Sequence, residues 1–191
     1  SSFEWLIKKI ENDIDFAKKN LPSGIWIKCN AIVDSKLIEK LYEASNAGVK
    51  INLFVRGICC LKPNVKGLSE NIIVKSIIGR FLEHGRIYVF ANGGEFQSIK
   101  NDVYISSADM MPRNLYTRVE AYVPLKNETV RSQILTQVIP ALINDTKNSW
   151  LLEQTGEYVK LEDKLNFCSH SYFMENQSLS GQGTLSKFKT A

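Results

Sequence analysis

The sequence lacks the features that mark membrane-spanning, secreted and metal-binding proteins. No apolar run approaches the roughly 20 residues that a membrane helix needs, and the first residues show no signal peptide. They also lack an initiating methionine, so we expect a piece of a longer chain whose neighbouring domains are missing. The cysteine spacing fits neither a zinc site nor a CxxC redox motif, which favours small buried side chains in a reducing compartment: Cys29, Cys59, Cys60 and Cys168.

Strong charge of either sign is also missing. The net charge is +4, which permits an anionic partner without the dense basic clusters of proteins that bind nucleic acid unselectively. We therefore expect no nucleic-acid partner. Hydrophobic residues make up 44% and charged residues 23%, as in ordinary globular domains. We expect one domain over residues 1–175 and a polar, flexible tail over residues 176–191.

The N-terminal part predicts a helix followed by a strand–helix–strand unit. Apolar residues recur at helical spacing over residues 3–19. Buried strands are predicted at 25–30 and 49–55, on either side of a helix that Asp34 caps and Gly48 closes. Short links in such a unit favour a parallel strand pair, which predicts an α/β domain.

The remaining sequence predicts a long loop, further strands and one long helix. The loop at 57–71 is rich in turn formers, and loops of this length are often functional. The expected elements are strands at 72–78, 84–90, 102–107 and 118–125, a turn at 92–94, a helix at 128–145 despite Pro140, and a hairpin from 150–154 and 157–161.

Polar groups suited to anions follow both strands of the strand–helix–strand unit. Lys28 and Asn30 end the first strand, and Arg56 follows the second. Parallel sheets bind ligands beyond the carboxyl ends of their strands. These residues therefore predict a binding site for an anionic ligand.

His84 and Arg86 form a second group of candidates for phosphate chemistry. If His84 begins a strand, the two side chains share a face. An imidazole can exchange a proton near neutral pH or attack phosphorus, and a guanidinium neutralises phosphoryl oxygens. Arg80 can add a further positive charge. His170, the other histidine, is predicted to be a surface or helix-cap residue.

A third group lies where a strand runs into a turn, at residues 104–114. Ser107 and Asn114 can donate hydrogen bonds to oxyanions, and Asp109 can orient a histidine or an arginine. Taken alone, this segment also fits a strand end capped by Ser and Asp, with Arg113 as a surface charge.

These segments together resemble one half-site of the phospholipase D superfamily, which uses His-x-Lys on a strand and a later Gly-Ser-x-Asn. The counterparts are His84-x-Arg86 and Ser106-Ser107-x-Asp109. Arg replaces Lys, the usual acid after the His-x-Lys element is absent, and Asp109 stands where Asn is common. Such enzymes need two half-sites, and this chain carries one.

Longer blocks are similar to the C-terminal portion of polyphosphate kinase: residues 42–71, 76–88 and 104–114, within a likeness that extends from the first helix to about residue 175. The resemblance implies a phospholipase D-like domain, with a mixed sheet flanked by helices. It also implies reversible transfer of the ATP γ-phosphate to polyphosphate with Mg²⁺. The N-terminal, head and first catalytic domains, with the histidine that becomes phosphorylated, would lie outside this chain.

The resemblance also implies roles for individual residues. His84 matches the second essential histidine of the family and Arg56 a nucleotide-binding arginine, so both are expected to contact ATP. Lower-ranked candidates line a phosphate path, namely Lys28, Arg80, Arg86, Arg113 and Asn114, while Glu83 and Asp109 are expected to orient these cations. No metal ligand is expected in this chain, because Mg²⁺ would be held by the nucleotide and the missing domains.

Two other functions remain open from the residues alone. One is a phospholipase D-like phosphodiesterase that pairs two half-sites by homodimerisation, and the other is a module that binds polyphosphate or another anion without catalysis. The expected partners are ATP or ADP, polyphosphate and the preceding catalytic domain. The full enzyme is expected to be a cytoplasmic homo-oligomer that can associate with a membrane as part of a complex.

Overall fold

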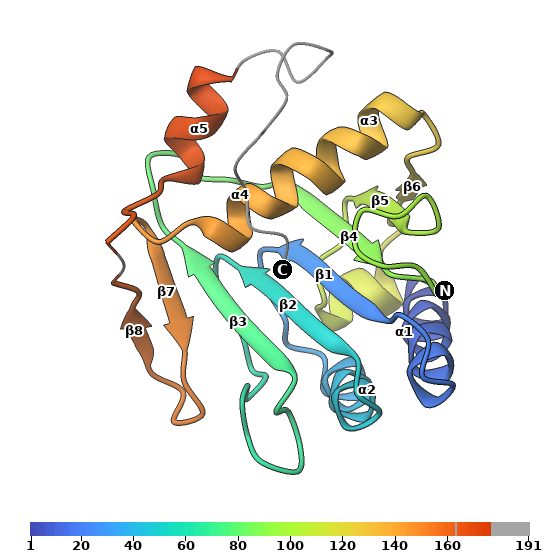
Figure 1. The fold of residues 1–191 in the computed structure, drawn as a ribbon. Helices are drawn as coiled ribbons and strands as arrows, with labels where there is room; N and C mark the ends of the chain where they lie inside the picture. Colours follow the sequence, from blue (N-terminus) through green and yellow to red (C-terminus); the bar gives the residue numbers. More distant parts are fainter. Residues whose placement is uncertain (163, 177–191) are drawn as a thin grey trace.

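The computed structural model describes residues 1–162 and 164–176, which form three layers with a mixed β-sheet in the middle (Figure 1). Within this part of the chain the sheet has eight strands in the order β6-β5-β4-β1-β2-β3-β7-β8. The pairs β1–β2 and β2–β3 are parallel, and all other neighbours are antiparallel. The predicted α/β class, the parallel pair and the mixed sheet flanked by helices are confirmed. The predicted tail beyond residue 176 lies outside the described residues.

The bounds of the elements follow the chain order. The first half contains α1 (Ser2–Lys18), β1 (Gly24–Cys29), α2 (Ser35–Asn46), β2 (Lys50–Val55), β3 (Ile72–Ile77) and β4 (Arg86–Phe90). The second half contains β5 (Asp102–Ser106), the π-helix η1 (Arg113–Thr117), β6 (Tyr122–Pro124), α3 (Glu128–Gln133), the π-helix η2 (Ile134–Val138), α4 (Ile139–Asn144), β7 (Ser149–Leu152), β8 (Tyr158–Lys160) and α5 (Ser169–Glu175).

The helix ends obey local rules that the sequence carries. A capping box of Ser1 and Glu4 begins α1. The carboxylate of Asp34 accepts a hydrogen bond from the Leu37 backbone N–H at 2.9 Å and begins α2. Gly48 follows this helix with φ +99°, a left-handed conformation that glycine adopts without steric penalty. Both predicted ends of α2 are confirmed.

The predicted helix over 128–145 is continuous but irregular. It consists of α3, η2 and α4, and the wider π-helical turns directly precede α4, which has Pro140 in its first turn. Proline has no N–H and its ring clashes with the carbonyl four residues earlier. A π-helical segment is one way in which a helix accommodates such an interruption.

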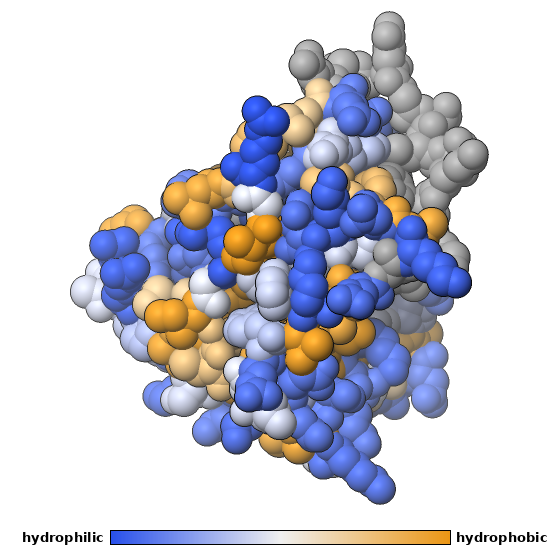
Figure 2. All heavy atoms as spheres, turned by 90° about the vertical axis from the view of Figure 1, so that its left-hand side faces the viewer, coloured by the Kyte–Doolittle hydropathy of each residue, from blue (hydrophilic) through white to orange (hydrophobic). Residues whose placement is uncertain are grey.

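Helices cover both faces of the sheet and enclose two apolar clusters. On one face, α1 and α2 bury residues that include Leu6, Ile10 and Leu41 against the strands. On the other face, η2 and α4 contribute Leu135, Ile139 and Leu142. Figure 2 shows the side of the molecule at which β7 and β8 lie, where apolar side chains form small separate patches among hydrophilic ones. Among the described helices, none combines the length and the apolarity needed to cross a membrane.

Two strands begin at least two residues later than the sequence predicts. The strand expected at 84–90 begins only at Arg86, and the strand expected at 118–125 begins only at Tyr122. Pairing of β4 with β1 ends at Ile87 opposite Lys28, and pairing with β5 ends at Arg86 opposite Ser106, so the chain before Arg86 has no neighbouring strand to continue either ladder. The argument that His84 shares a strand face with Arg86 is therefore wrong, because His84 lies in the loop before the strand.

Candidate active site at one edge of the sheet

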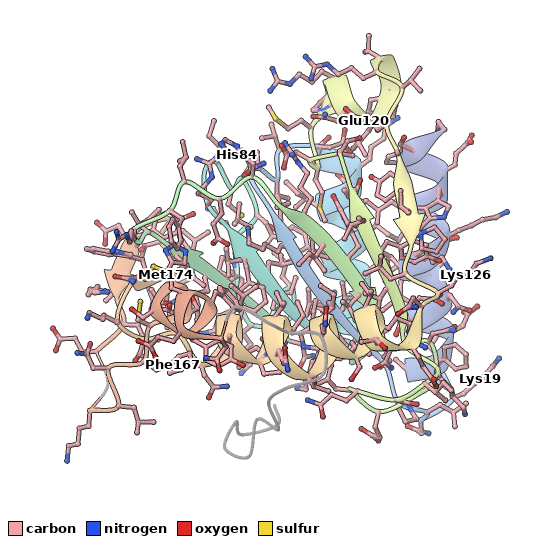
Figure 3. The ribbon with its side chains drawn as sticks, turned by 90° about the horizontal axis from the view of Figure 1, so that it is seen from above. Lys19, His84, Glu120, Lys126, Phe167 and Met174 are labelled. Atoms are coloured by element: carbon pink, nitrogen blue, oxygen red, sulfur yellow. The ribbon has the colours of Figure 1, made fainter. Side chains whose placement is uncertain are left out.

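The topology brings several polar segments to one edge of the sheet. Because β1 and β2 run parallel and β4 runs antiparallel to β1, the ends of β1 and β2 meet the start of β4. The next pairings place the end of β5 and the start of β6 at the same edge. Figure 3 shows His84 and Glu120 along this edge, although 35 residues separate them in the sequence.

Asp109 is the hub of this edge. Its carboxylate accepts hydrogen bonds from the Asn30 backbone N–H at 2.6 Å and from the Arg86 guanidinium at 2.8 Å. The loop that carries it is tied to the end of β1, because the Met110 N–H donates to the Ala31 carbonyl at 3.0 Å. Burial alone would raise the pKa of Asp109. The hydrogen bonds from Arg86 and Asn30 outweigh that effect and hold its pKa below the usual value.

Asn30 extends this network to Arg56. The Asn30 side-chain oxygen accepts a hydrogen bond from Arg56 Nε at 3.2 Å, and its amide group faces Asp109 Oδ2 at 3.4 Å. The terminal nitrogens of Arg56 make no hydrogen bond within the described part of the chain, so they are available for a ligand. The network therefore orients two guanidinium groups, those of Arg56 and Arg86, around one carboxylate.

Lys28 supports the loop that carries His84. Its ammonium group is largely buried, donates a hydrogen bond to the Gly85 carbonyl at 3.2 Å, and lies 3.8 Å from Glu83 Oε2. Burial lowers the pKa of Lys28, and the nearby Glu83 carboxylate opposes this effect. In the structure, Lys28 thus contacts the loop of residues 83–85. The sequence had predicted that Lys28 lines a phosphate path.

His84 and the neighbouring cations differ in the contacts that their side chains make. The His84 side chain is exposed, and its own carbonyl accepts a hydrogen bond from Arg86 at 3.0 Å. Arg80 and Arg113 are also exposed and have no ion-pair partner among residues 1–162 and 164–176. The structure therefore brings His84, Arg86, Arg56 and Asp109 to one edge, while their roles in a reaction remain predictions.

Glu120 belongs to this edge although the sequence did not single it out. Its carboxylate accepts hydrogen bonds from the Ser107 hydroxyl and the Asn114 amide. The Ser107 hydrogen bond, with a smaller contribution from Asn114, holds the pKa of Glu120 below its usual value against the effect of burial. The two donors predicted to bind an oxyanion thus bind a carboxylate of the chain itself. The alternation in Arg118-Val-Glu120 was the available signal, because it places two charges on one side of an extended segment.

His170 is buried, so its prediction as a surface or helix-cap residue is wrong. Only 1% of the residue is exposed. Its Nε2 lies 3.1 Å from Glu83 Oε2, and its Nδ1 accepts a hydrogen bond from the Phe81 N–H at 3.2 Å. These partners lie 87 and 89 residues away in the sequence, which is why local patterns did not reveal them.

The cysteine prediction is confirmed in part. All the cysteines are free, and Cys29 is buried, but Cys60 is exposed and Cys59 and Cys168 are only partly covered. The described residues contain no group of three or more His, Cys, Asp or Glu side chains arranged to hold a metal ion. Glu83, Asp109 and Glu120 each bind groups of the chain itself.

The mixed sheet and its basic edge place this chain in the class of phospholipase D-like α/β domains. Residues 2–169 match the family described as polyphosphate kinase C-terminal domain 2. The chain therefore belongs to the polyphosphate kinase family, as its second C-terminal domain.

Individual relatives agree with this assignment. A polyphosphate kinase of Erythrobacter litoralis is 52% identical over 181 residues, which cover 94% of this chain and 25% of that protein. A polyphosphate kinase of Helicobacter pylori is 45% identical over 177 residues, covering 91% and 24%. The crystal structure of polyphosphate kinase from Porphyromonas gingivalis superposes with a TM-score of 0.84 at 33% identity, covering 91% of this chain and 26% of that one. The chain thus spans about a quarter of the length of these relatives.

Proposed function

We propose that this chain supplies one half of the active site of a polyphosphate kinase, which transfers the terminal phosphate of ATP reversibly to polyphosphate. The observation that carries this proposal is the network Arg86–Asp109–Asn30–Arg56 beside His84. Phosphoryl transfer depends mainly on positioning and on neutralisation of the charge on the phosphoryl oxygens. Two oriented guanidinium groups next to an exposed imidazole meet that requirement.

Each residue then has a role that follows from its contacts. Arg56 binds the triphosphate through its terminal nitrogens, in a two-pronged contact that suits a planar guanidinium. His84 donates and accepts a proton, or hydrogen-bonds the phosphate in transfer. Arg80 and Arg113, which are exposed, contact the polyphosphate chain, and Arg86 is held beside the reacting phosphate by Asp109.

The remaining parts of the site come from elsewhere in the polypeptide. We propose that the preceding catalytic domain supplies the nucleophilic histidine, so that this chain alone is inactive. Magnesium bound with the nucleotide would neutralise phosphate charge, and its ligands would come from those other parts. A cytoplasmic location is part of the same proposal and is supported by the free cysteines.

The test is synthesis of polyphosphate from ATP by the full-length enzyme that carries this chain. His84→Gln is expected to abolish synthesis while the protein remains folded. Lys126→Gln is the matched control, because Lys126 is exposed and lies away from this edge (Figure 3). Full activity of His84→Gln would contradict the role of His84. Hydrolysis of a nitrophenyl phosphodiester without ATP would instead support a homodimeric phosphodiesterase.

A further inference from the structure

Helix α5 contacts the loop that carries His84 through the buried side chain of His170. His170 uses both of its ring nitrogens for this purpose. The backbone N–H of Phe81 donates to Nδ1 at 3.2 Å, and Nε2 lies 3.1 Å from Glu83 Oε2. The rings of Phe81 and His170 also pack together, with their centroids 5.1 Å apart.

The two hydrogen bonds define one orientation of the imidazole. A backbone N–H can only donate, so Nδ1 must be the acceptor and carry no hydrogen. The hydrogen of the neutral ring is then on Nε2, which donates it to the Glu83 carboxylate. A flipped ring would turn carbon atoms towards both partners, so the position of His170 is tightly specified.

The loop approaches His170 so closely that a side chain would not fit between them. A Cβ atom added at Gly79 would lie 2.5 Å from His170 Nδ1, closer than real Cβ contacts. Glycine at this position therefore permits the approach. This close contact is an observation separate from the two hydrogen bonds, and it involves the same loop and the same His170 side chain.

The residues on both sides of His84 are anchored. Glu83 is held by His170 and faces Lys28, and the Gly85 carbonyl accepts a hydrogen bond from the Lys28 ammonium group. The His84 side chain itself makes no hydrogen bond within the described residues. Its place at the edge of the sheet is therefore set by the backbone of this loop.

We propose that His170 is a positioning residue for His84. This inference rests on the proposed function, since it concerns the placement of the histidine that acts in that reaction. A displacement of a reacting group by about 1 Å can lower a rate by about a hundredfold. His170 touches no substrate in this scheme and acts only by keeping residues 79–85 in place.

The experiment compares variants of the full-length enzyme by kinetics and by hydrogen exchange of the peptide that contains residues 79–85. His170→Ala is expected to lower kcat by about tenfold to a hundredfold, with a much smaller change in the KM for ATP. It should also speed exchange in this peptide. Gly79→Ala should change both quantities in the same direction without removing a polar group. His170→Asn keeps a hydrogen-bond acceptor near the place of Nδ1. It should therefore recover part of the kcat and part of the protection from hydrogen exchange.

Ser171→Ala is the matched control, because it changes the next residue of the same helix, and the hydrogen bond of Ser171 runs from its backbone N–H to Cys168 Sγ. Unchanged exchange in His170→Ala would overturn the anchoring, and faster exchange with an unchanged kcat would overturn the positioning role. Thermal unfolding measures the fraction of folded enzyme in each variant. A fall in kcat that only parallels a loss of folded enzyme would also overturn the positioning role. A wild-type enzyme without polyphosphate synthesis would contradict the proposed function, while the exchange data would still decide whether His170 anchors the loop.

Discussion

Arg86 and Asp109 form an ion pair at 2.8 Å that joins the start of β4 to the loop after β5. The pair is only partly accessible to solvent, because the side chains are 22% and 7% exposed. The same carboxylate also binds the backbone at the end of β1. One acidic side chain thus aligns three neighbouring segments at the edge where His84 lies.

Loss of the Asp109 charge is expected to release Arg86. In the full-length enzyme, Asp109→Asn should lower kcat by about tenfold to a hundredfold, because the guanidinium loses its charged partner. The measurement is steady-state synthesis of polyphosphate from ATP. Asp102→Asn is a suitable control, because Asp102 pairs with Lys9 away from this network. Equal kcat values for Asp109→Asn and the wild type would show that the ion pair has no influence on the reaction.

Arg56→Lys should separate the effect of charge from the effect of side-chain geometry at the proposed nucleotide site. Lysine keeps the positive charge but loses the planar fork and the Nε hydrogen bond to Asn30. We expect the KM for ATP to rise by roughly tenfold, the change that corresponds to about 1.4 kcal/mol of binding free energy. Arg131→Lys provides the comparison, because Arg131 bonds backbone carbonyls far from this edge. An unchanged KM for ATP would remove Arg56 from the nucleotide site.

The buried ammonium group of Lys75 should stabilise the fold. It donates hydrogen bonds to the carbonyls of Leu142, Ile143 and Asp145, at the C-terminal end of α4 where carbonyls lack helical partners. Burial lowers the pKa of Lys75 to about 8, so the charged form prevails at pH 7.

Lys75→Met should therefore lower the free energy of unfolding of the 191-residue chain by about 2 to 4 kcal/mol, because the Leu142 and Ile143 carbonyls lose their ammonium donor. The Asp145 carbonyl keeps the hydrogen bond from the Ser149 hydroxyl. Urea denaturation at pH 7 measures this change. Lys66→Met, at an exposed position, should have an effect within about 0.5 kcal/mol. Similar unfolding midpoints for the two variants would contradict the assignment.

Asp13 should make the stability depend on pH. Its side chain is buried beneath the turn after β4, and burial raises its pKa to about 6 against the hydrogen bonds from the Gly24 and Asn92 N–H groups. A folded-state pKa above the unfolded value means that the folded protein binds the proton more tightly. The resulting stabilisation is complete below about pH 4 and is lost as the pH rises through 6.

Asp13→Asn should remove this dependence. Relative to the variant, the wild type is expected to lose about 2 to 3 kcal/mol of unfolding free energy between pH 4 and pH 8, because its pKa shift is about two units. Urea denaturation across this range, with the exposed Asp15→Asn as the control, provides the measurement. Parallel pH profiles of the wild type and Asp13→Asn would show that the Asp13 carboxyl has the same pKa in the folded and the unfolded protein.

Local patterns were sufficient for features that depend on neighbours in the sequence. Asp34 and Gly48 mark the ends of α2 because a helix cap needs only residues three or four positions away. The alternation of buried strands and a helix predicted the parallel pair, which in turn predicted that Asn30 and Arg56 would meet at one edge. The resemblance to polyphosphate kinase supplied the particular importance of His84.

Features that depend on contacts between distant parts of the chain became clear only from the tertiary structure. A strand ends where its neighbours stop pairing, so the registers of β4 with β1 and β5 were needed to show that His84 lies in a loop. Glu120 joins the edge because β6 returns beside β5, and His170 is buried because α5 packs on a loop 87 residues earlier in the chain. The sequence by itself thus determined the elements, the family and most of the charged groups at the edge. The fold determined how Arg56 and Arg86 are held at this edge, because their partners Asn30 and Asp109 are distant in the chain.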